Sequence, residues 1–374
     1  MRDDMKKALI VFGTRPEAIK MCPLVKEMQS RRRIKTKVCV TSQHREMLRQ
    51  VLEVFDVVPD YDLDIMQPGQ TLFDVTSHAL TAMEGVLAEF RPDVVFVHGD
   101  TTTAFAASLA CFYMQIPVAH VEAGLRTRNV YSPYPEEYNR QAISLVARYH
   151  FAPTQMARYN LRLEGKPFET IYVTGNTGID ALRYTVNQDY TSELADWAKG
   201  SRLLVVTAHR RENLGGNMRH MFRAIRRVLD NYSDVKAVYP VHMNPLVQSE
   251  ASEAFKGCKS MKLVPPLDVI GFHNLMSRAY LILTDSGGIQ EEAPSLGKPV
   301  LVMRDTTERP EGVEAGTLRL VGTDEEIIYY ACRQLLDDPQ EYEIMSKAKN
   351  PYGDGHASAK IADIIERELG VYVH

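Results

Sequence analysis

The 374-residue chain has no apolar segment long enough to span a bilayer, which takes about 20 residues of helix. Its charged start leads into a short apolar run, without the longer apolar region and cleavage site of a secretory signal. It also has no excess of charge, and a net charge of −4 gives no general attraction to nucleic acid. We therefore expect a cytoplasmic protein that binds neither membranes nor nucleic acid.

Cysteine is scarce, and its spacing argues against two common uses. The five cysteines are odd in number and widely spaced, without a Cys-x-x-Cys pair. Neither a disulfide framework nor a zinc knuckle fits that pattern, so we predict reduced, mostly structural thiols. Asp62 and Asp64 imitate a metal-binding Asp-x-Asp pair, but they precede a Gln-Pro-Gly loop instead of ending a core strand. We predict no metal site.

Apolar residues make up 45% of the chain, and its length exceeds what one hydrophobic core usually fills. Short β-branched runs alternate with longer helical patterns, which is typical of parallel βαβ units. We predict an α/β fold of two doubly wound, Rossmann-like domains that face each other across a cleft. The predicted strands are 8–12, 38–41, 94–98, 118–121, 150–152 and 171–173 in the first half, and 203–207, 237–240, 262–264, 281–284, 300–302 and 318–320 in the second.

Two breaker-rich segments divide the chain. Thr174–Gly178 is polar and contains glycine, which makes it the best linker between the halves. The Asn350–Gly355 loop precedes a last amphipathic helix from about Ala357 to Leu369. We expect hinge closure around a ligand at these two segments. The predicted parts are a first domain of residues 1–173, a second domain of residues 174–356, and a helical tail of residues 357–374 that packs back on the first domain.

The segment Asp285–Glu292, Asp-Ser-Gly-Gly-Ile-Gln-Glu-Glu, follows a predicted strand and begins a predicted helix. Ser286, Gly287 and Gly288 expose backbone N–H donors at the helix start, where the helix dipole favours an anion such as phosphate. Glu292 lies one to two turns further along, within reach of a sugar attached to that phosphate. The motif suggests a nucleotide or nucleotide-sugar site, and a plain strand-to-helix turn is the alternative.

Ligands of open parallel sheets bind beyond the carboxyl ends of the strands, so polar residues there are candidates. Arg15 precedes Pro16 at a predicted helix start and can hold phosphate through two parallel hydrogen bonds. A surface ion pair with Glu17 is the alternative. In the second half, His209 lies nearest the end of the first strand and is the preferred contact to the same anion. A buried histidine bonded to a backbone carbonyl is the alternative there.

Three carboxylates, Asp100, Glu122 and Glu136, form a second group of candidates. Acidic side chains crowded near a cleft raise one another's proton affinity, so one can act as a base while another is protonated. For Asp100 alone, an N-cap is the alternative. Arg309 follows a later strand and is placed to close over the ligand, unless it is a solvated turn charge. Phe272 is a candidate to stack on a base, unless it belongs to the core.

Seven motifs occur in order over nearly the whole chain: Gly13–Glu17, His98–Thr103, His120–Arg126, Pro135–Glu137, Thr207–Glu212, Asp285–Glu292 and Arg304–Glu311. Together they resemble the non-hydrolysing UDP-N-acetylglucosamine 2-epimerases. The resemblance implies a GT-B glycosyltransferase-like fold, a homodimer, and interconversion of UDP-N-acetylglucosamine and UDP-N-acetylmannosamine. In some organisms such enzymes supply capsule and other surface polysaccharides.

The resemblance also implies roles for individual residues. The substrate-binding set is Arg15, Lys20, Phe272, Ser286, Gly287, Gly288, Glu292 and Arg309, with the segment near Phe272 at the uracil and Glu292 at the ribose. The catalytic set is Asp100, Glu122, Glu136 and His209. A second UDP-N-acetylglucosamine, bound as an activator, would contact Gln43, His44, Gln70, Arg210 and His242. Glu46 stands where some relatives carry a glutamine, so the match at this activator site is looser.

The chemistry fits this inventory. Inverting C2 of an N-acetylhexosamine breaks a C–H bond that has no adjacent carbonyl. A redox route needs a nicotinamide, but no Gly-x-Gly-x-x-Gly follows the first strand, and we expect no cofactor. Elimination of UDP to 2-acetamidoglucal, followed by re-addition, uses cations for the leaving phosphate and carboxylates for the proton. The alternatives are a hydrolysing epimerase that releases N-acetylmannosamine and UDP, and a UDP-sugar glycosyltransferase.

Overall fold

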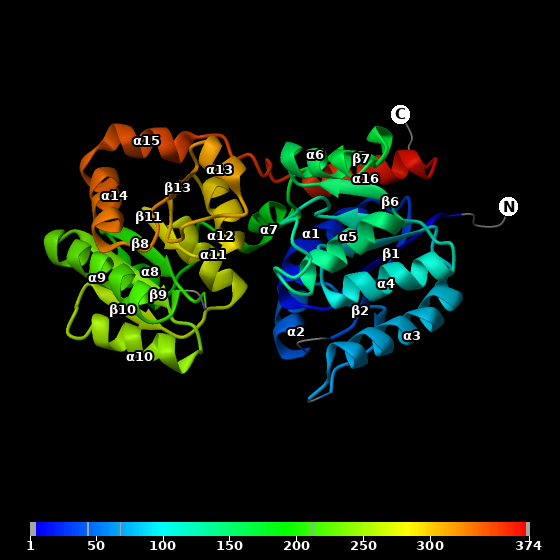
Figure 1. Ribbon diagram of the computed structural model, residues 1–374, viewed down its shortest axis with the longest axis horizontal. Helices are drawn as coiled ribbons and strands as arrows, with labels where there is room; N and C mark the ends of the chain where they lie inside the picture. The colour runs from blue at the N-terminus through cyan, green and yellow to red at the C-terminus, as the bar shows by residue number, and fades with distance from the viewer. Residues whose placement is uncertain (1–4, 43–44, 68, 211–212, 372–374) are drawn as a thin grey trace. The chain divides into compact units, whose positions relative to one another are not determined.

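The structure is a computed structural model that describes residues 5–42, 45–67, 69–210 and 213–371, and it contains two compact units (Figure 1). Residues 1–183 and 352–374 form the first unit, and residues 184–351 form the second. The sequence analysis places the divisions at 173/174 and 356/357. They differ because Thr174–Gly178 packs within the first unit, where the Asn176 N–H donates to the Tyr352 carbonyl at 2.7 Å.

The first unit is built on a seven-stranded parallel sheet in the order β3-β2-β1-β4-β5-β6-β7. The chain winds outward from β1 in one direction and from β4 in the other, so the switch point of the sheet lies between β1 and β4. Ligands of such sheets bind beside the strand ends at this point. The strands are β1 (Lys7–Phe12), β2 (Lys35–Val40), β3 (Tyr61–Asp62), β4 (Val94–His98), β5 (Val118–Val121), β6 (Ala147–Ala152) and β7 (Ile171–Val173).

Helices cover both faces of this sheet, as the alternation of side chains along β1 requires. Ile10 and Phe12 point into the core beneath α1, α2 and α16, whereas Leu9 and Val11 point into the core beneath α3 and α4. The helices are α1 (Arg15–Arg31), α2 (Arg45–Val54), α3 (Leu72–Phe90), α4 (Thr102–Tyr113), α5 (Glu136–Val146), α6 (Gln155–Leu163), α7 (Thr177–Thr185) and α16 (Ala357–Glu368), with a short 3-10 turn η1 (Phe168–Thr170).

The second unit repeats the plan with six parallel strands in the order β10-β9-β8-β11-β12-β13. Its switch point lies between β8 and β11. The strands are β8 (Arg202–Thr207), β9 (Val235–Pro240), β10 (Met261–Val264), β11 (Leu281–Thr284), β12 (Val300–Val302) and β13 (Leu318–Leu320). The helices are α8 (Glu193–Ala198), α9 (Gly216–Asn231), α10 (Pro245–Ala254), α11 (Val269–Ser277), α12 (Gly287–Glu292), α13 (Pro310–Glu314), α14 (Glu325–Asp337) and α15 (Pro339–Lys347), with a 3-10 turn η3 (Ala293–Leu296).

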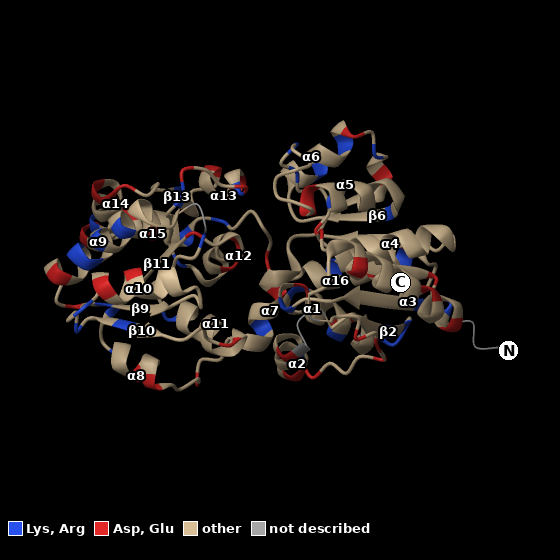
Figure 2. Ribbon diagram, turned by 60° about the horizontal axis from the view of Figure 1, so that its bottom comes forward, with Lys and Arg blue, Asp and Glu red and all other residues tan. Residues whose placement is uncertain are grey.

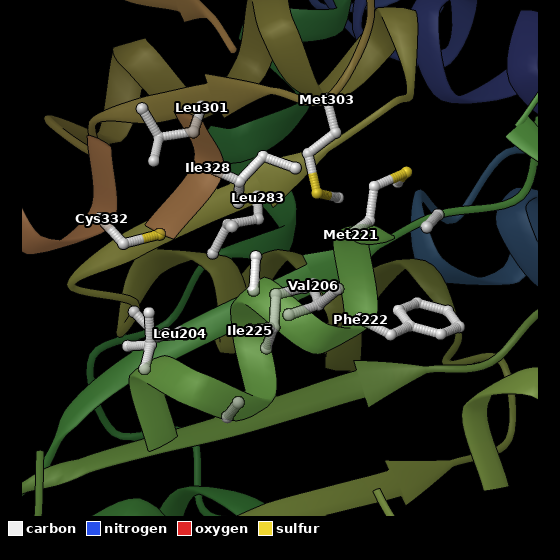
Figure 3. Close-up of a cluster of buried hydrophobic side chains, with 14 of the residues drawn as sticks. Leu204, Val206, Met221, Phe222, Ile225, Leu283, Leu301, Met303, Ile328 and Cys332 are labelled. Carbon is white, nitrogen blue, oxygen red and sulfur yellow. The ribbon is translucent and has the colours of Figure 1, made fainter. Parts of the chain in front are cut away.

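One face of the second sheet holds the largest apolar cluster of that unit (Figure 3). Val206 of β8 and Leu283 of β11 pack against Ile225 of α9 and Ile328 of α14, and all four side chains are fully buried. This core packs against β8 and β11 just before their carboxyl ends. It therefore fixes the two strand ends that carry the candidate residues of the second unit.

The predicted α/β fold with two parallel sheets is confirmed, and each of the twelve predicted strands corresponds to an observed one. The sequence analysis missed β3, an edge strand of only two residues without an apolar run. Basic and acidic residues are interspersed along both units (Figure 2). Among the helices that the structure describes, none has the length and apolarity to cross a membrane. All five cysteines carry free thiols, and burial raises the pKa of Cys39 and Cys332 to about 12.

Candidate active site

The carboxylates of the first unit follow the strands next to its switch point. Glu122 comes directly after β5, and Asp100 lies two residues after β4. These strand ends are adjacent because His98 pairs with Val121 across the sheet. Glu122 has a left-handed backbone with φ of 64°, a conformation that costs a non-glycine residue about 1–3 kcal/mol. The chain therefore turns sharply at the residue that carries the carboxylate.

Three side chains from different elements surround the Glu122 carboxylate. Lys20 of α1 forms a hydrogen-bonded ion pair with it, and Asn176 donates to the same oxygen at 2.9 Å. His98 Nε2 lies 3.7 Å from that oxygen. Burial, the largest single influence, would raise the pKa of Glu122, since its side chain is only 11% exposed. Lys20 and His98 together outweigh burial and hold this pKa well below its ordinary value, so Glu122 is a carboxylate.

Asp100 is held by an arginine on α5. Arg140 of α5 forms a hydrogen-bonded ion pair with the Asp100 carboxylate, and its other terminal nitrogen lies 3.3 Å from Glu137. The Asn139 amide donates to the Asp100 carbonyl at 2.9 Å. The N-cap of α4 is Thr101 rather than Asp100, because the Thr101 hydroxyl accepts the Ala104 N–H. The carboxylate of Asp100 therefore pairs with Arg140 and does not cap α4.

The neighbours Glu136 and Glu137, both in the first turn of α5, have different environments. Glu137 is fully buried and accepts the N–H groups of Thr127 and Arg128, at 3.1 and 3.2 Å. It builds the loop ahead of α5. Glu136 is half-buried, and the described residues include no hydrogen-bond or ion-pair partner of its side chain. Of the two, Glu136 is the one that remains available to a ligand.

Arg15 is the first residue of α1, which begins with a capping box between Thr14 and Glu17. The Glu17 carboxylate accepts the Gly13 and Thr14 N–H groups at 3.0 and 2.8 Å, and the Thr101 hydroxyl at 2.7 Å. These bonds fix the turn after β1 beside the start of α4. Glu17 therefore anchors the segment that presents Arg15 at the switch point of the first sheet.

In the second unit, one buried carboxylate ties the ends of β8 and β11 together. Asp285 follows β11 and accepts the N–H groups of His209 and Arg210, both at 2.9 Å, and the Asn213 amide at 3.2 Å. Burial would raise the pKa of Asp285, but its bonds from His209 and Arg210 hold the pKa below the ordinary 3.8. The sequence analysis quoted Asp285 within its motif and assigned it no role. Its position directly after a strand was the available signal.

His209 is paired with this carboxylate through its side chain as well. Its Nδ1 lies 3.2 Å from Asp285 Oδ1, and its ring stacks on His242 with a centroid separation of 5.5 Å. The side chain is 41% exposed, so His209 is not a buried histidine bonded to a backbone carbonyl. With Nδ1 directed at Asp285, the other ring nitrogen is left for a ligand or a proton.

Ser286, Gly287 and Gly288 occupy the start of α12, with Ser286 as the N-cap. A Cβ built on Gly287 would lie 3.0 Å from the Arg309 guanidinium carbon, so the guanidinium lies directly against this glycine. Arg309 also donates from Nε to Glu291 at 2.8 Å, which orients the group. A helix start and a fixed guanidinium thus share one place, and both favour an anion.

Beside this turn is a cavity of about 190 Å³, lined by His209, His242, Phe272 and Ser286 together with proline and leucine side chains. Phe272 is half-buried and contributes to this lining. Glu292, at the end of α12, has its carboxylate 3.4 Å from His273 Nε2 and is 14% exposed. The lining of the cavity is mostly apolar, with a few polar side chains among its residues.

The residues predicted for an activator are distributed over both units. Gln43 and His44 lie outside the described residues. In the first unit, the Gln70 amide donates to the Ile65 carbonyl at 2.8 Å and supports its own loop. In the second, Arg210 donates from Nε to the Asp285 carbonyl at 3.0 Å, and His242 stacks on His209.

The Asp-x-Asp pair, Asp62 and Asp64, lies in a loop that is held by its own hydrogen bonds. The Asp62 carboxylate accepts the Ser42 hydroxyl at 2.6 Å and the Asp64 N–H at 3.1 Å, which closes a loop. Over the described ranges of the chain, no three histidine, cysteine or acidic side chains gather in a way that could hold a metal ion. The Asp62 carboxylate therefore supports the loop in which it lies.

Comparison with known proteins decides the family. The sequence model of the UDP-N-acetylglucosamine 2-epimerases matches residues 26–366. The chain belongs to this family. The UDP-N-acetylglucosamine 2-epimerase of Bacillus subtilis (strain 168) is 57% identical over 357 residues, which cover 96% of this chain and 94% of that protein.

Two solved structures extend the comparison to the fold. The UDP-GlcNAc 2-epimerase of Neisseria meningitidis bound to UDP-GlcNAc is 47% identical, with a TM-score of 0.87 over 96% of this chain and 100% of that one. S. aureus MnaA with UDP is 49% identical, with a TM-score of 0.91 over 99% and 98% of the two chains. The two parallel sheets are thus those of the GT-B-like fold of this family.

Proposed function

We propose that this protein interconverts UDP-N-acetylglucosamine and UDP-N-acetylmannosamine by inverting C2 without hydrolysis. The observation that carries the proposal is the Glu122 carboxylate, buried and ionised at a strand end, in a chain that belongs to this family. A buried carboxylate beside a lysine is prepared to accept a proton once the substrate arrives. The Neisseria relative, solved with UDP-GlcNAc, supports the choice of substrate.

In this proposal the second unit holds the UDP part of the substrate. Ser286, Gly287 and Gly288 bind the diphosphate together with the Arg309 guanidinium, which already lies against Gly287. The two glycines use their N–H groups, and Ser286 uses its hydroxyl because its own N–H donates to the Thr284 hydroxyl at 2.9 Å. Phe272 contacts the uracil, and Glu292 accepts from the ribose hydroxyls. From the first unit, Arg15 and Lys20 add positive charge near the leaving phosphate and the sugar.

The carboxylates of the first unit carry out the proton transfers at C2. The C1–O bond breaks with its electron pair going to the UDP oxygen, while a carboxylate removes the C2 proton and a C1–C2 double bond forms. The intermediate is 2-acetamidoglucal. Re-addition of UDP at C1 with protonation of C2 from the other face gives the epimer. Glu122 acts as the base on one face, and Asp100 or Glu136 serves the other.

His209 assists the departure of UDP. Because Asp285 lies 3.2 Å from Nδ1, it orients the ring and leaves Nε2 to act on the leaving phosphate oxygen. This arrangement resembles other histidine–carboxylate pairs, in which the carboxylate sets the ring orientation. The division of labour is therefore charge stabilisation by the second unit and proton transfer by the first.

One experiment separates this function from its rivals. The protein is incubated with UDP-N-acetylglucosamine in heavy water without any acceptor, and the products are followed by proton NMR. We expect UDP-N-acetylmannosamine that carries deuterium at C2. Free N-acetylmannosamine with UDP would indicate a hydrolysing epimerase. Turnover that requires an added acceptor would indicate a glycosyltransferase.

We also propose that the protein acts as a homodimer, that a second UDP-N-acetylglucosamine activates it, and that its product feeds surface polysaccharide synthesis. Exposed apolar side chains on α4 and α5 support the first point: Phe112, Tyr113 and Leu145 are 58%, 67% and 77% exposed. Light scattering of the purified protein tests the dimer. Sigmoidal dependence of rate on substrate concentration tests activation.

A further inference from the structure

Asn176 connects the Glu122 carboxylate to the backbone of the first unit just before α7 begins. Its side-chain oxygen accepts the Gly178 N–H at 2.8 Å, and its side-chain nitrogen donates to Glu122 at 2.9 Å. This pair of bonds fixes the orientation of the amide, because a flipped amide would place oxygen against the carboxylate and nitrogen against the N–H. Asn176 is 3% exposed, so both bonds are shielded from water.

The same residue joins two stretches of chain that are far apart in sequence. The first leads into the second unit through α7, and the second returns from it after residue 351. The Asn176 N–H donates to the Tyr352 carbonyl at 2.7 Å. Gly175 lies so close to the returning chain that a Cβ on it would be 3.1 Å from the Tyr352 carbonyl and 3.2 Å from Gly353 Cα. The two backbones therefore contact each other directly at Asn176.

We call the contact of Gly175 and Asn176 with Tyr352 and Gly353 the junction. Of the three groups around Glu122, only Asn176 belongs to it. Lys20 is on α1 and His98 ends β4, so both are fixed by the first sheet and its helices. They set the charge around Glu122, since they are the titratable groups that face its carboxylate. The amide of Asn176 is uncharged. Its contribution is to orient the Glu122 carboxylate, because its hydrogen bond holds one carboxylate oxygen from the side of the junction.

We propose that Asn176 is a positioning residue that fixes the Glu122 carboxylate. Through Asn176, the placement of this carboxylate depends on the contact between the outgoing chain at Asn176 and the returning chain at Tyr352. This inference rests on the proposed epimerase function, in which Glu122 transfers the C2 proton. A shift of the returning chain moves the Asn176 backbone through the bond to Tyr352. The bond from its side chain passes that shift on to the carboxylate, where a displacement of about 1 Å can cost roughly a hundredfold in rate.

The test compares two substitutions at this position. Asn176→Ala removes the donor, and we expect kcat to fall roughly tenfold while KM changes by less than about threefold. Asn176→Asp keeps the acceptor for Gly178 but places a second negative charge against Glu122. A like charge disfavours the ionisation of Glu122. The acid limb of the pH profile of kcat/KM should therefore move to higher pH by about one unit or more. Activity at pH 9 should then recover in part.

The matched control is Asp180→Ala, four residues further along the same segment. The Asp180 carboxylate accepts the N–H groups of Ala357 and Ser358 at 3.1 and 2.8 Å and does not contact Glu122. Its loss should lower the melting temperature and leave the acid limb unchanged. If the Asn176 variants lose activity only in proportion to their loss of stability, with an unmoved acid limb, Asn176 is merely structural and the inference is wrong.

A second measurement does not depend on activity. The titration of Glu122 can be followed by carbon-13 NMR of protein labelled at the glutamate Cδ, with its signal assigned by its absence in Glu122→Gln. We expect a higher titration midpoint in Asn176→Asp than in the wild type and no change in Asp180→Ala. An unchanged midpoint in Asn176→Asp overturns the inference. A wild type that makes no UDP-N-acetylmannosamine overturns the proposed function alone, and the NMR result still decides the role of Asn176.

Discussion

The two units contain the same kind of feature, a buried carboxylate at a strand end next to the switch point, but they stabilise it differently. Glu122 in the first unit is held by side chains, among them the ammonium of Lys20. Asp285 in the second unit is held largely by the main chain, through two backbone N–H groups, with the Asn213 amide and the His209 ring beside it. Side-chain partners can rearrange when a substrate arrives, whereas backbone donors hold a carboxylate in place as a structural anion. We infer that the first unit performs the proton chemistry and the second holds the nucleotide.

The largest expected effect tests whether Glu122 performs the proton chemistry of the first unit. Glu122→Gln keeps the size and the hydrogen bonds of the side chain but cannot accept a proton. We expect kcat to fall about a thousandfold, within the range for removal of a general base. The affinity for UDP, measured by calorimetry, should stay within about threefold of the wild type. Equal losses in affinity and turnover would instead assign Glu122 to substrate binding.

A smaller effect is expected in the second unit. His209→Asn removes the group that faces the leaving phosphate while the Asp285 bonds to the backbone persist. Loss of one such donor costs about 3 kcal/mol, so kcat should fall roughly a hundredfold. Arg319→Ala serves as the control, because this arginine pairs with Glu341 at 3.2 Å and is assigned no part in the site. A His209→Asn protein with normal turnover would contradict the assignment of His209 to the leaving group.

The ion pair at Glu122 can be tested through pH. Removing the positive charge in Lys20→Met disfavours the carboxylate, so the pKa of Glu122 rises from its depressed value. The acid limb of kcat/KM should therefore move to higher pH, with a loss of roughly tenfold near pH 6 and less at pH 9. Lys26→Met, on the same helix, removes a lysine that contacts Asp56 instead and should leave the profile unchanged. An unmoved limb in Lys20→Met would show that Glu122 is not the group that titrates.

The sequence predicted the architecture because its signals are local. Short apolar strands between amphipathic helices specify two parallel sheets. Residues one or two positions after a strand, such as Asp100, Glu122 and Ser286, are brought to the carboxyl edge by topology alone. The motifs then select among them by resemblance. The sequence could not specify which side chains far apart along the chain become hydrogen-bond or ion-pair partners. The pairs Lys20–Glu122, Asn176–Glu122 and Arg140–Asp100 join residues 102, 54 and 40 positions apart, and no local pattern encodes them.

Asp285 and Glu137 show the same limit from another side. Both stand in motifs, next to residues chosen for chemistry, and both are fully buried supports in the structure. Adjacent carboxylates such as Glu136 and Glu137 look alike in a sequence, because exposure and backbone hydrogen bonds depend on how the loop ahead of α5 folds. Function and support can therefore be told apart only when the partners are known.

The smallest expected effect sharpens the role of the second unit as an anion site. In Gly287→Ala the new methyl group would lie 3.0 Å from the Arg309 guanidinium and must push it away from the start of α12. The Glu291 bond restrains that movement, so we expect a severalfold weaker affinity for UDP with kcat little changed. Gly216→Ala, at the start of α9, meets nothing within 4 Å and is the matched control. If Gly287→Ala binds UDP as tightly as Gly216→Ala, the guanidinium and the helix start do not share one phosphate, and the anion site must rest on the N–H groups and His209 alone.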